Sequence, residues 1–153
     1  MDKSYLIQSA GLLKQVSQSA LLEFQMNTNK ILGIMNQRMQ QRKDLDALIG
    51  KDNLQMMFDN HANHLRFMSS MFKNYNANVM VETILWVFGA YQSHGFQSNY
   101  WAAQLNTWIE VLKSELTPGT FNEIYPFYEW MQVNIPHFTS LSNNSQNPNQ
   151  PMH

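Results

Sequence analysis

The chain has 153 residues, a formal net charge of −1, no cysteine and a charged fraction of only 14%. This length fits one domain with a hydrophobic core. The near-zero charge argues against a nucleic-acid partner, and the lack of cysteine excludes disulfides, thiolate nucleophiles and cysteine-bound metal or haem. No apolar run approaches the roughly eighteen residues of a membrane span, and the first residues lack a signal-peptide pattern. We therefore expect a cytoplasmic protein without a membrane span.

Residues 3–40 carry apolar side chains at three- and four-residue spacing, which predicts one or two long helices. Gly33 is the expected point of a bend or break. A helix of this length packs either against a second subunit or across the core of its own chain. The charged residues 37–50 predict a solvated connection with one helical turn, ending at Gly50.

The next predicted helix carries the two closely spaced histidines. Asp52 is its expected N-cap, with Gln55 as the capping-box partner. One apolar stripe is expected to face the interior: Leu54, Met57, Phe58, His61, Leu65, Met68 and Phe72. His61 lies at the centre of this stripe and His64 about 60° from it. We expect one imidazole in the interior and the other at its margin.

A nearly all-apolar segment, residues 77–94, predicts a central helix that is buried on every side. Asn76 or Asn78 is the expected cap. The only charge in the segment is Glu82, so we expect a buried carboxylate that needs a partner. Gly95 follows as the residue that ends the helix.

Two further helices complete the prediction. Ser98 can cap a fourth helix, and Thr117 followed by Pro118 begins a fifth. Thr120 and Glu123 form a possible capping box inside the fifth helix. Pro126 and Pro136 are expected to kink or end it.

The expected fold is all-α, with five to six helices in a globin-like or related bundle formed by residues 1–140. Residues 141–153 are rich in Ser, Asn, Gln and Pro, and they predict a disordered tail.

The first candidate site is a metal site formed by His61, His64 and Glu82. Two imidazoles one helical turn apart and a carboxylate from the next, antiparallel helix suit zinc or non-haem iron. In a small metalloenzyme, Glu82 would act as the base. The structural alternative is a buried His61 bonded to a neighbour, a solvated His64, and Glu82 paired with Arg66 or a capping amide.

The second candidate site is a tetrapyrrole pocket. His64 and His94 are thirty residues apart on consecutive predicted helices. The helix order, the chain length and this spacing resemble the globin fold over residues 52–141. The resemblance implies His94 as the iron ligand and His64 or His61 as the distal group. The phenylalanine that globins carry ahead of the distal histidine falls near Lys43 here, which differs from that pattern.

The segments 64–67 and 94–96, together with Trp86, also resemble helical input modules of bacterial sensor proteins. Sensor globins of the stressosome type keep this fold without haem. Trp86 and Tyr91 belong to a dense aromatic set that predicts either a flat-ligand pocket or plain core.

The favoured function is a non-enzymatic sensor or ligand-binding module. Haem, another tetrapyrrole, a divalent metal or a small apolar ligand would bind between the helices carrying His61/His64 and Glu82/His94. The signal would reach a protein partner through helix packing at a homodimer face. The alternative is a structural or adaptor protein that self-assembles through helix packing without a cofactor. The sequence contains no glycine-rich phosphate loop and no nucleophile elbow.

Overall fold

The computed structural model describes residues 2–145, which form eight α-helices and no strand. The helices are α1 (Lys3–Ala10), α2 (Gln18–Gln40), α3 (Leu45–Ile49), α4 (Leu54–Lys73), α5 (Ala77–Gln92), α6 (Ser98–Glu115), α7 (Pro118–Val133) and α8 (Ile135–Ser145). The all-α prediction is confirmed, but the expected number of five to six helices is too low. None of the described helices has both the length and the apolar character needed to cross a membrane.

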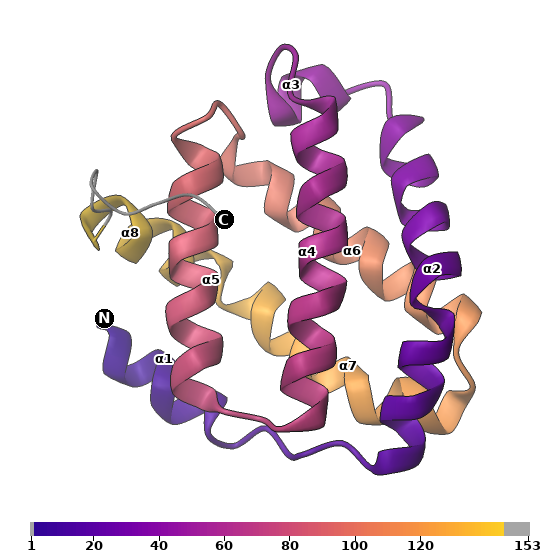
Figure 1. Cartoon of the computed structure of the whole chain (residues 1–153). Helices are drawn as coiled ribbons and strands as arrows, with labels where there is room; N and C mark the ends of the chain where they lie inside the picture. The colour runs from indigo at the N-terminus through magenta and orange to yellow at the C-terminus, as the bar shows by residue number, and fades with distance from the viewer. Residues whose placement is uncertain (1, 146–153) are drawn as a thin grey trace.

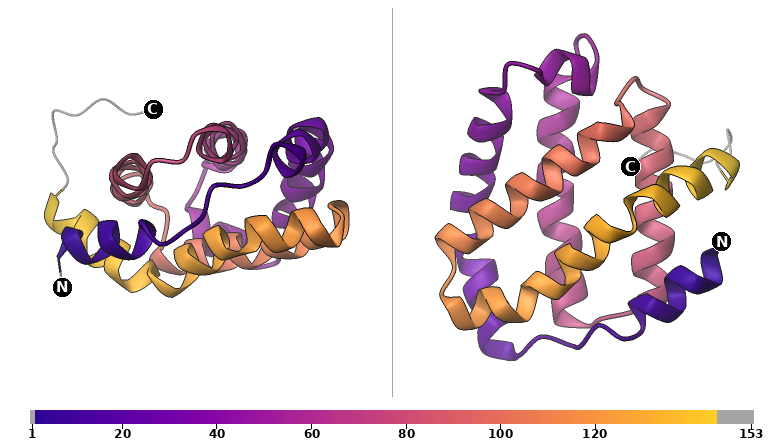
Figure 2. Two further views of the ribbon diagram at one scale, coloured as in Figure 1. Left: turned by 90° about the horizontal axis from the view of Figure 1, so that it is seen from below. Right: turned by 180° about the vertical axis from the view of Figure 1, so that it is seen from behind.

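The helices lie in two layers. Helices α2, α4 and α5 run side by side in one layer, and α6 and α7 cross them obliquely in the other (Figures 1 and 2). Helix α4 packs on α2, whereas α5 packs on α1 and α8. Helix α6 packs on both α2 and α7. The consecutive helices α4 and α5 therefore have different principal partners.

The first long segment divides at Gly11 rather than at Gly33. Helix α1 ends before Gly11, and Ser17 caps α2 by accepting a hydrogen bond from the Ala20 amide. The side chain of Gln15 holds the connection in place, because it donates to the Phe72 carbonyl and accepts from the Tyr75 amide. Gly33 lies inside α2, where nothing crowds it.

The predicted solvated connection contains α3, whose apolar side chains Leu45, Leu48 and Ile49 are buried. The expected Asp52 cap is wrong, because Asp52 adopts a φ of 65° and Asn53 takes the N-cap position. The Asn53 amide donates to the Ile49 and His94 carbonyls, 2.7 and 2.8 Å away. These bonds join the end of α3 to the turn between α5 and α6.

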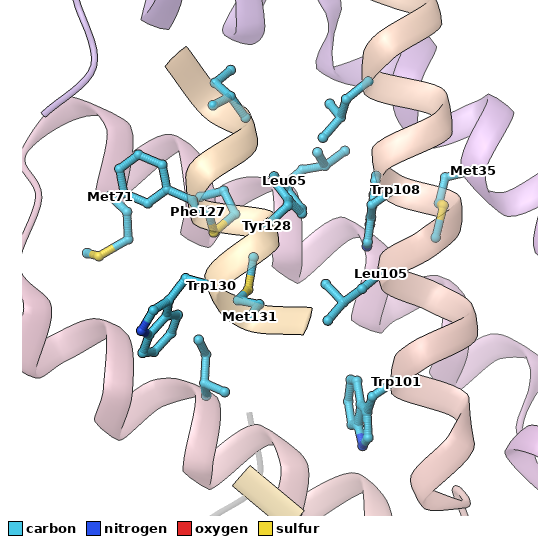
Figure 3. Close-up of a cluster of buried hydrophobic side chains, with 14 of the residues drawn as sticks. Met35, Leu65, Met71, Trp101, Leu105, Trp108, Phe127, Tyr128, Trp130 and Met131 are labelled. Atoms are coloured by element: carbon cyan, nitrogen blue, oxygen red, sulfur yellow. The ribbon is translucent and has the colours of Figure 1, made fainter. Parts of the chain in front are cut away.

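Helix α5 is capped by Asn76, as predicted, but it is not buried on every side. Val79 and Glu82 are exposed on its outer face. Helix α6 packs on α2, α3, α7 and α8, and it buries eight residues: Tyr100, Trp101, Gln104, Leu105, Thr107, Trp108, Val111 and Leu112. Figure 3 shows Trp101, Leu105 and Trp108 along one face of α6, with α7 opposite.

The prolines do not end α7. The helix runs through Pro126 to Val133, and Pro136 lies in the first turn of α8, where a missing amide hydrogen is tolerated. The prediction of a disordered tail is wrong for residues 141–145, which belong to α8. Within this segment Ser142 is buried and Leu141 packs against the core, and Phe138 is buried earlier in α8. The rest of the predicted tail, residues 146–153, lies outside the described residues.

Two glutamates cap the first turns of α2 and α7 reciprocally. Glu23 of α2 accepts hydrogen bonds from the Thr117 amide and hydroxyl, both at 2.7 Å, and from the Thr120 hydroxyl at 2.6 Å. Glu123 of α7 accepts from the Ser17 amide and hydroxyl at 2.7 and 2.8 Å. The predicted Thr120–Glu123 capping box is therefore wrong, because both side chains bond to the other helix.

We expect Glu23→Gln to lower the free energy of unfolding by about 1–2 kcal/mol, because an amide replaces an acceptor of three charge-assisted bonds. The Thr120 hydroxyl, and then Thr117, hold the pKa of Glu23 below its usual 4.5. A lowered carboxyl pKa stabilises the fold above the unfolded value and ceases to do so as pH falls through the folded value. The difference in free energy of unfolding between Glu23→Gln and the wild type should therefore be largest above pH 4.5 and shrink below it. Urea denaturation across this pH range measures it.

The matched control is Glu110→Gln. Glu110 is exposed, and its ion pair with Arg38 is long, with 3.8 Å between Oε2 and Nη1. It should change stability by less than about 0.5 kcal/mol. Equal losses in the two variants would contradict the capping role of Glu23.

Candidate ligand-binding cavity

A cavity of about 360 Å³ lies between α4 and α5, and α6, α7 and α8 contribute to its walls. It forms because a short turn, residues 74–76, reverses the chain, while α4 and α5 then pack on different partners. The lining residues are Asn60, Asn63, His64, Phe67, Met68, Thr83, Ile84, Trp86, Val87, Phe88, Tyr91, Trp101, Gln104, Leu105, Met131 and Phe138. Ligand pockets commonly have volumes of about 300–1,000 Å³.

The greater part of the lining is apolar and aromatic. Trp101 stacks on Phe88 with ring centroids 4.2 Å apart, and Phe88 meets the edge of Phe138 at 5.2 Å. Figure 3 shows Leu105 of α6 and Met131 of α7 on facing sides of the same interior space. Interlocked rings leave few alternative side-chain positions, so these walls are preorganised.

Two lining residues, Asn60 and Gln104, belong to a buried polar triangle with Tyr100, which lies behind the lining. The Tyr100 hydroxyl donates to Asn60 Oδ1 at 2.8 Å, and Gln104 Nε2 donates to Asn60 Oδ1 and, at 3.0 Å, to the Tyr100 oxygen. All three side chains are buried. Burial raises the pKa of Tyr100, so its hydroxyl stays protonated.

Tyr91 adds a second hydroxyl at this part of the cavity. Its oxygen lies beside the Asn60 and Asn63 side chains. Burial, and then the negative charge of Asp59, raises the pKa of Tyr91. Asn63 is positioned in turn by Arg66, which donates to Asn63 Oδ1.

His64 reaches the cavity from α4. Its ring stacks on Trp108 with centroids 4.8 Å apart, and its Nε2 lies 2.7 Å from the Tyr128 hydroxyl. Burial, and then the neighbouring His61, lowers the pKa of His64 to about 3. A neutral imidazole has one N–H, and burial raises the pKa of Tyr128. We therefore assign the Tyr128 hydroxyl as the donor to Nε2, which leaves the proton on Nδ1.

His61 lies behind the cavity and is not part of its lining. The side chain is fully buried, its Nδ1 is 2.6 Å from Asn36 Oδ1, and its ring meets Trp108 edge-on. Because the side-chain oxygen of Asn36 can only accept, we assign the proton of His61 to Nδ1, which leaves Nε2 as an acceptor. His61 Nε2 and Trp108 Nε1 are both buried without a hydrogen-bond partner in the described part of the chain. Burial lowers the pKa of His61 to about 3.

Two of the predicted site residues lie elsewhere. Glu82 is exposed on the outer face of α5, where its carboxylate lies 2.6 Å from Lys3 Nζ. The expectation of a buried Glu82 is therefore wrong, and its partner is Lys3 rather than Arg66. His94 is exposed in the turn after α5, where only its carbonyl oxygen has a role, accepting from Asn53.

The predicted metal site is not assembled, because Glu82 points away from the two histidines. Within residues 2–145, no three His, Asp or Glu side chains lie close enough together to hold a metal ion. The residues also do not fit a haem bound through His94. That side chain lies outside the lining, His61 is sealed behind Trp108, and the Nε2 of His64 is bonded to Tyr128.

Of the predicted cofactor-binding residues, the cavity lining includes His64, Trp86 and Tyr91. Asn60 and Gln104 line the cavity but were not predicted from the sequence. The available signal was an amide side chain within an apolar face. Gln104 lies one helical turn before Trp108 on the buried face of α6, and Asn60 directly precedes the buried His61.

No protein-family model, no curated protein and no solved structure matches this chain. The resemblance to globins and to helical sensor modules therefore stays a prediction from sequence.

The two buried histidines predict a loss of stability in mild acid. Their folded pKa of about 3 lies below the ordinary 6.5, so the unfolded chain binds more protons between these values. The free energy of unfolding therefore has its full value, as far as these histidines contribute, above pH 6.5. It falls as pH drops from 6.5 toward 3, by up to about 1.4 kcal/mol per pH unit for each histidine.

We expect His64→Gln to remove about half of this pH dependence, because Gln can accept from Tyr128 but does not titrate. His94→Gln is the matched control, since His94 is exposed, and it should leave the slope unchanged. Urea denaturation between pH 4 and 7.5 gives the slopes. Identical slopes in the wild type and His64→Gln would contradict a neutral buried His64.

Proposed function

We propose that this protein is a non-enzymatic helical module that binds a small, uncharged, mainly apolar molecule between α4 and α5. The observation that carries the proposal is the cavity of about 360 Å³, with aromatic walls and a few convergent polar groups. This combination is typical of small-molecule sites. The lining contains no Asp, Glu, Lys or Arg side chain. A charged ligand would lose its hydration without gaining a counter-charge, so a neutral ligand is favoured.

The chemistry of the polar groups favours binding over catalysis. They are amides, hydroxyls and one imidazole, and the Nε2 of that imidazole is already bonded to Tyr128. A general base works best with a pKa near the working pH, whereas that of His64 is lowered to about 3. The same groups are well suited to orient a ligand through neutral hydrogen bonds.

A ligand in this position would link two parts of the fold that pack separately. Helix α4 rests on α2, and α5 rests on α1 and α8. A bound molecule would touch both α4 and α5 and so favour one spacing between them. This is the basis for proposing a sensor whose signal is a change in helix packing.

The test uses N-phenyl-1-naphthylamine, a neutral fluorophore that brightens in apolar surroundings. We expect saturable binding to the wild type at one site per chain. Val87→Trp should weaken binding at least about tenfold, because Val87 lines the cavity and a larger side chain fills it. Fluorescence titration provides the measurement.

The matched control is Val79→Trp, on the exposed face of the same helix. It should bind the fluorophore like the wild type, and circular dichroism verifies that both variants remain helical. Equal affinities in the two variants, or no saturable binding to the wild type, would remove the cavity as the ligand site.

A second candidate function, self-assembly through helix packing, has one specific observation in its favour. Leu22 and Met26 lie one turn apart on α2, and their side chains are 48% and 86% exposed. Large exposed apolar side chains on one helix face are enriched at protein interfaces. This face is where the predicted homodimer through the first long helix would form.

We expect Met26→Glu to lower the association constant of such a dimer at least tenfold, because it puts a charge in the centre of the apolar face. Gln37→Glu, exposed on the same helix about 16 Å along the axis from Met26, is the control for added charge. Sedimentation equilibrium measures the association state. A wild-type protein that stays monomeric at high concentration would exclude this function.

A further inference from the structure

We infer that the cavity selects a ligand whose neutral polar head carries a hydrogen-bond donor and an acceptor side by side, as in a primary amide or a lactam. This inference rests on the proposed function and specifies its ligand class. Asn60 and Gln104 carry it, through the polar atoms that their mutual hydrogen bonds leave unused.

Each of the two amides uses one of its two polar atoms in the triangle with Tyr100. Asn60 Oδ1 accepts from Tyr100 and Gln104, and Gln104 Nε2 is the donor. The triangle does not use Asn60 Nδ2 or Gln104 Oε1. Both residues are almost completely buried and line the cavity, and the Tyr91 hydroxyl lies beside the Asn60 amide. A ligand in the cavity would meet the Gln104 Oε1 oxygen and the Asn60 Nδ2 hydrogen that Tyr91 does not use.

This result does not depend on how the two amides are oriented. If both amides are flipped, Asn60 Nδ2 donates to Tyr100 and to Gln104 Oε1, and the Tyr100 hydroxyl donates to Gln104 Oε1. The triangle then has the same number of bonds. In either orientation one amino group and one carbonyl oxygen lie outside the triangle, on residues that line the cavity. The wall therefore offers a donor and an acceptor together, which matches a ligand with the complementary pair.

The neighbouring groups strengthen this end of the cavity without adding charge. The Tyr91 hydroxyl lies beside Asn60 and Asn63, and His64 supplies the Nδ1 proton assigned above. Further along α4, Phe67 and Met68 replace the polar residues in the lining. Asn60 and Met68 are separated by about 12 Å at the usual helical rise of about 1.5 Å per residue. Along α4 the lining thus changes from polar to apolar residues.

A ligand with a neutral hydrogen-bonding head and an aliphatic or aromatic body fits this gradient. A carboxylate head would bring acceptors alone and a charge that no lining residue offsets. A head with only an acceptor would leave one of the wall's two atoms unpaired, and a buried unpaired polar group is costly.

The experiment compares three probes with the same six-carbon chain: heptanamide, 2-octanone and heptanoate at pH 8. Heptanamide and 2-octanone have nearly the same shape, but only the amide has donors. Each probe displaces N-phenyl-1-naphthylamine from the wild type, and the displacement gives its affinity. We expect the amide to bind about three- to tenfold more tightly than the ketone, and heptanoate to bind most weakly.

Gln104→Met removes one member of the pair at nearly constant volume. We expect it to reverse the preference, so that the ketone binds more tightly than the amide, while binding of the fluorophore itself persists. Gln37→Met, exposed on α2, is the matched control and should keep the wild-type preference. Because the readout is a ratio of two affinities, a general loss of stability does not produce the reversal. If Gln104→Met does not fold, the ratio of amide to ketone affinity in the wild type still tests the inference.

The outcomes separate this inference from the proposed function. If the ketone binds the wild type as tightly as the amide, or if heptanoate binds most tightly, the inference is wrong but the cavity remains a binding site. If the fluorophore shows no saturable binding, both fail. A reversal confined to Gln104→Met supports both.

Discussion

The structure depends on the different packing of two consecutive helices. Helices α4 and α5 are joined by a short turn, yet α4 rests on α2 and α5 rests on α1 and α8. Side chains of α6 close the space between them from behind, and Trp101 and Leu105 form part of that wall. Because protein interiors are otherwise close-packed, a cavity of about 360 Å³ reflects a constraint on helix placement rather than loose packing throughout the core.

That constraint is maintained by contacts at the ends of the helices. Reciprocal bonds from Glu23 and Glu123 join the first turns of α2 and α7, so the two layers are fixed to each other at one side. At another place, Asn53 bonds to the carbonyl oxygens of Ile49 and His94. Gly50 and Gly95 both have positive φ there, and a Cβ added to Gly50 would lie 3.2 Å from the Gly95 carbonyl oxygen. Glycine is needed at Gly50 for this close backbone approach.

The buried polar groups explain why the lining of the cavity changes from polar to apolar along α4. Polar groups removed from water must be hydrogen-bonded, and here they form pairs and a triangle rather than one large network: His61 with Asn36, His64 with Tyr128, and Tyr100 with two amides. These bonds use one polar atom of His64, Asn60 and Gln104, and all three residues also line the cavity. The binding properties that we propose are thus a consequence of how the core satisfies its own polar atoms.

The sequence by itself determined the helical class, the positions of most helices and the burial of His61, whereas His64 is more buried than the predicted margin position. These features follow from local periodicity and from caps such as Asn76, Thr117 and Pro118, which act within a few residues. Only the tertiary structure decided which faces meet. Glu82 and His94 have the right chemistry and a suitable spacing along the chain, yet α5 turns Glu82 toward Lys3 and leaves His94 exposed. Asn60 and Gln104, far apart in sequence, become neighbours because α6 crosses over α4 in the other layer (Figure 2). Periodicity gives the face of one helix, but the partner of that face depends on packing of the whole chain, which local spacing does not encode.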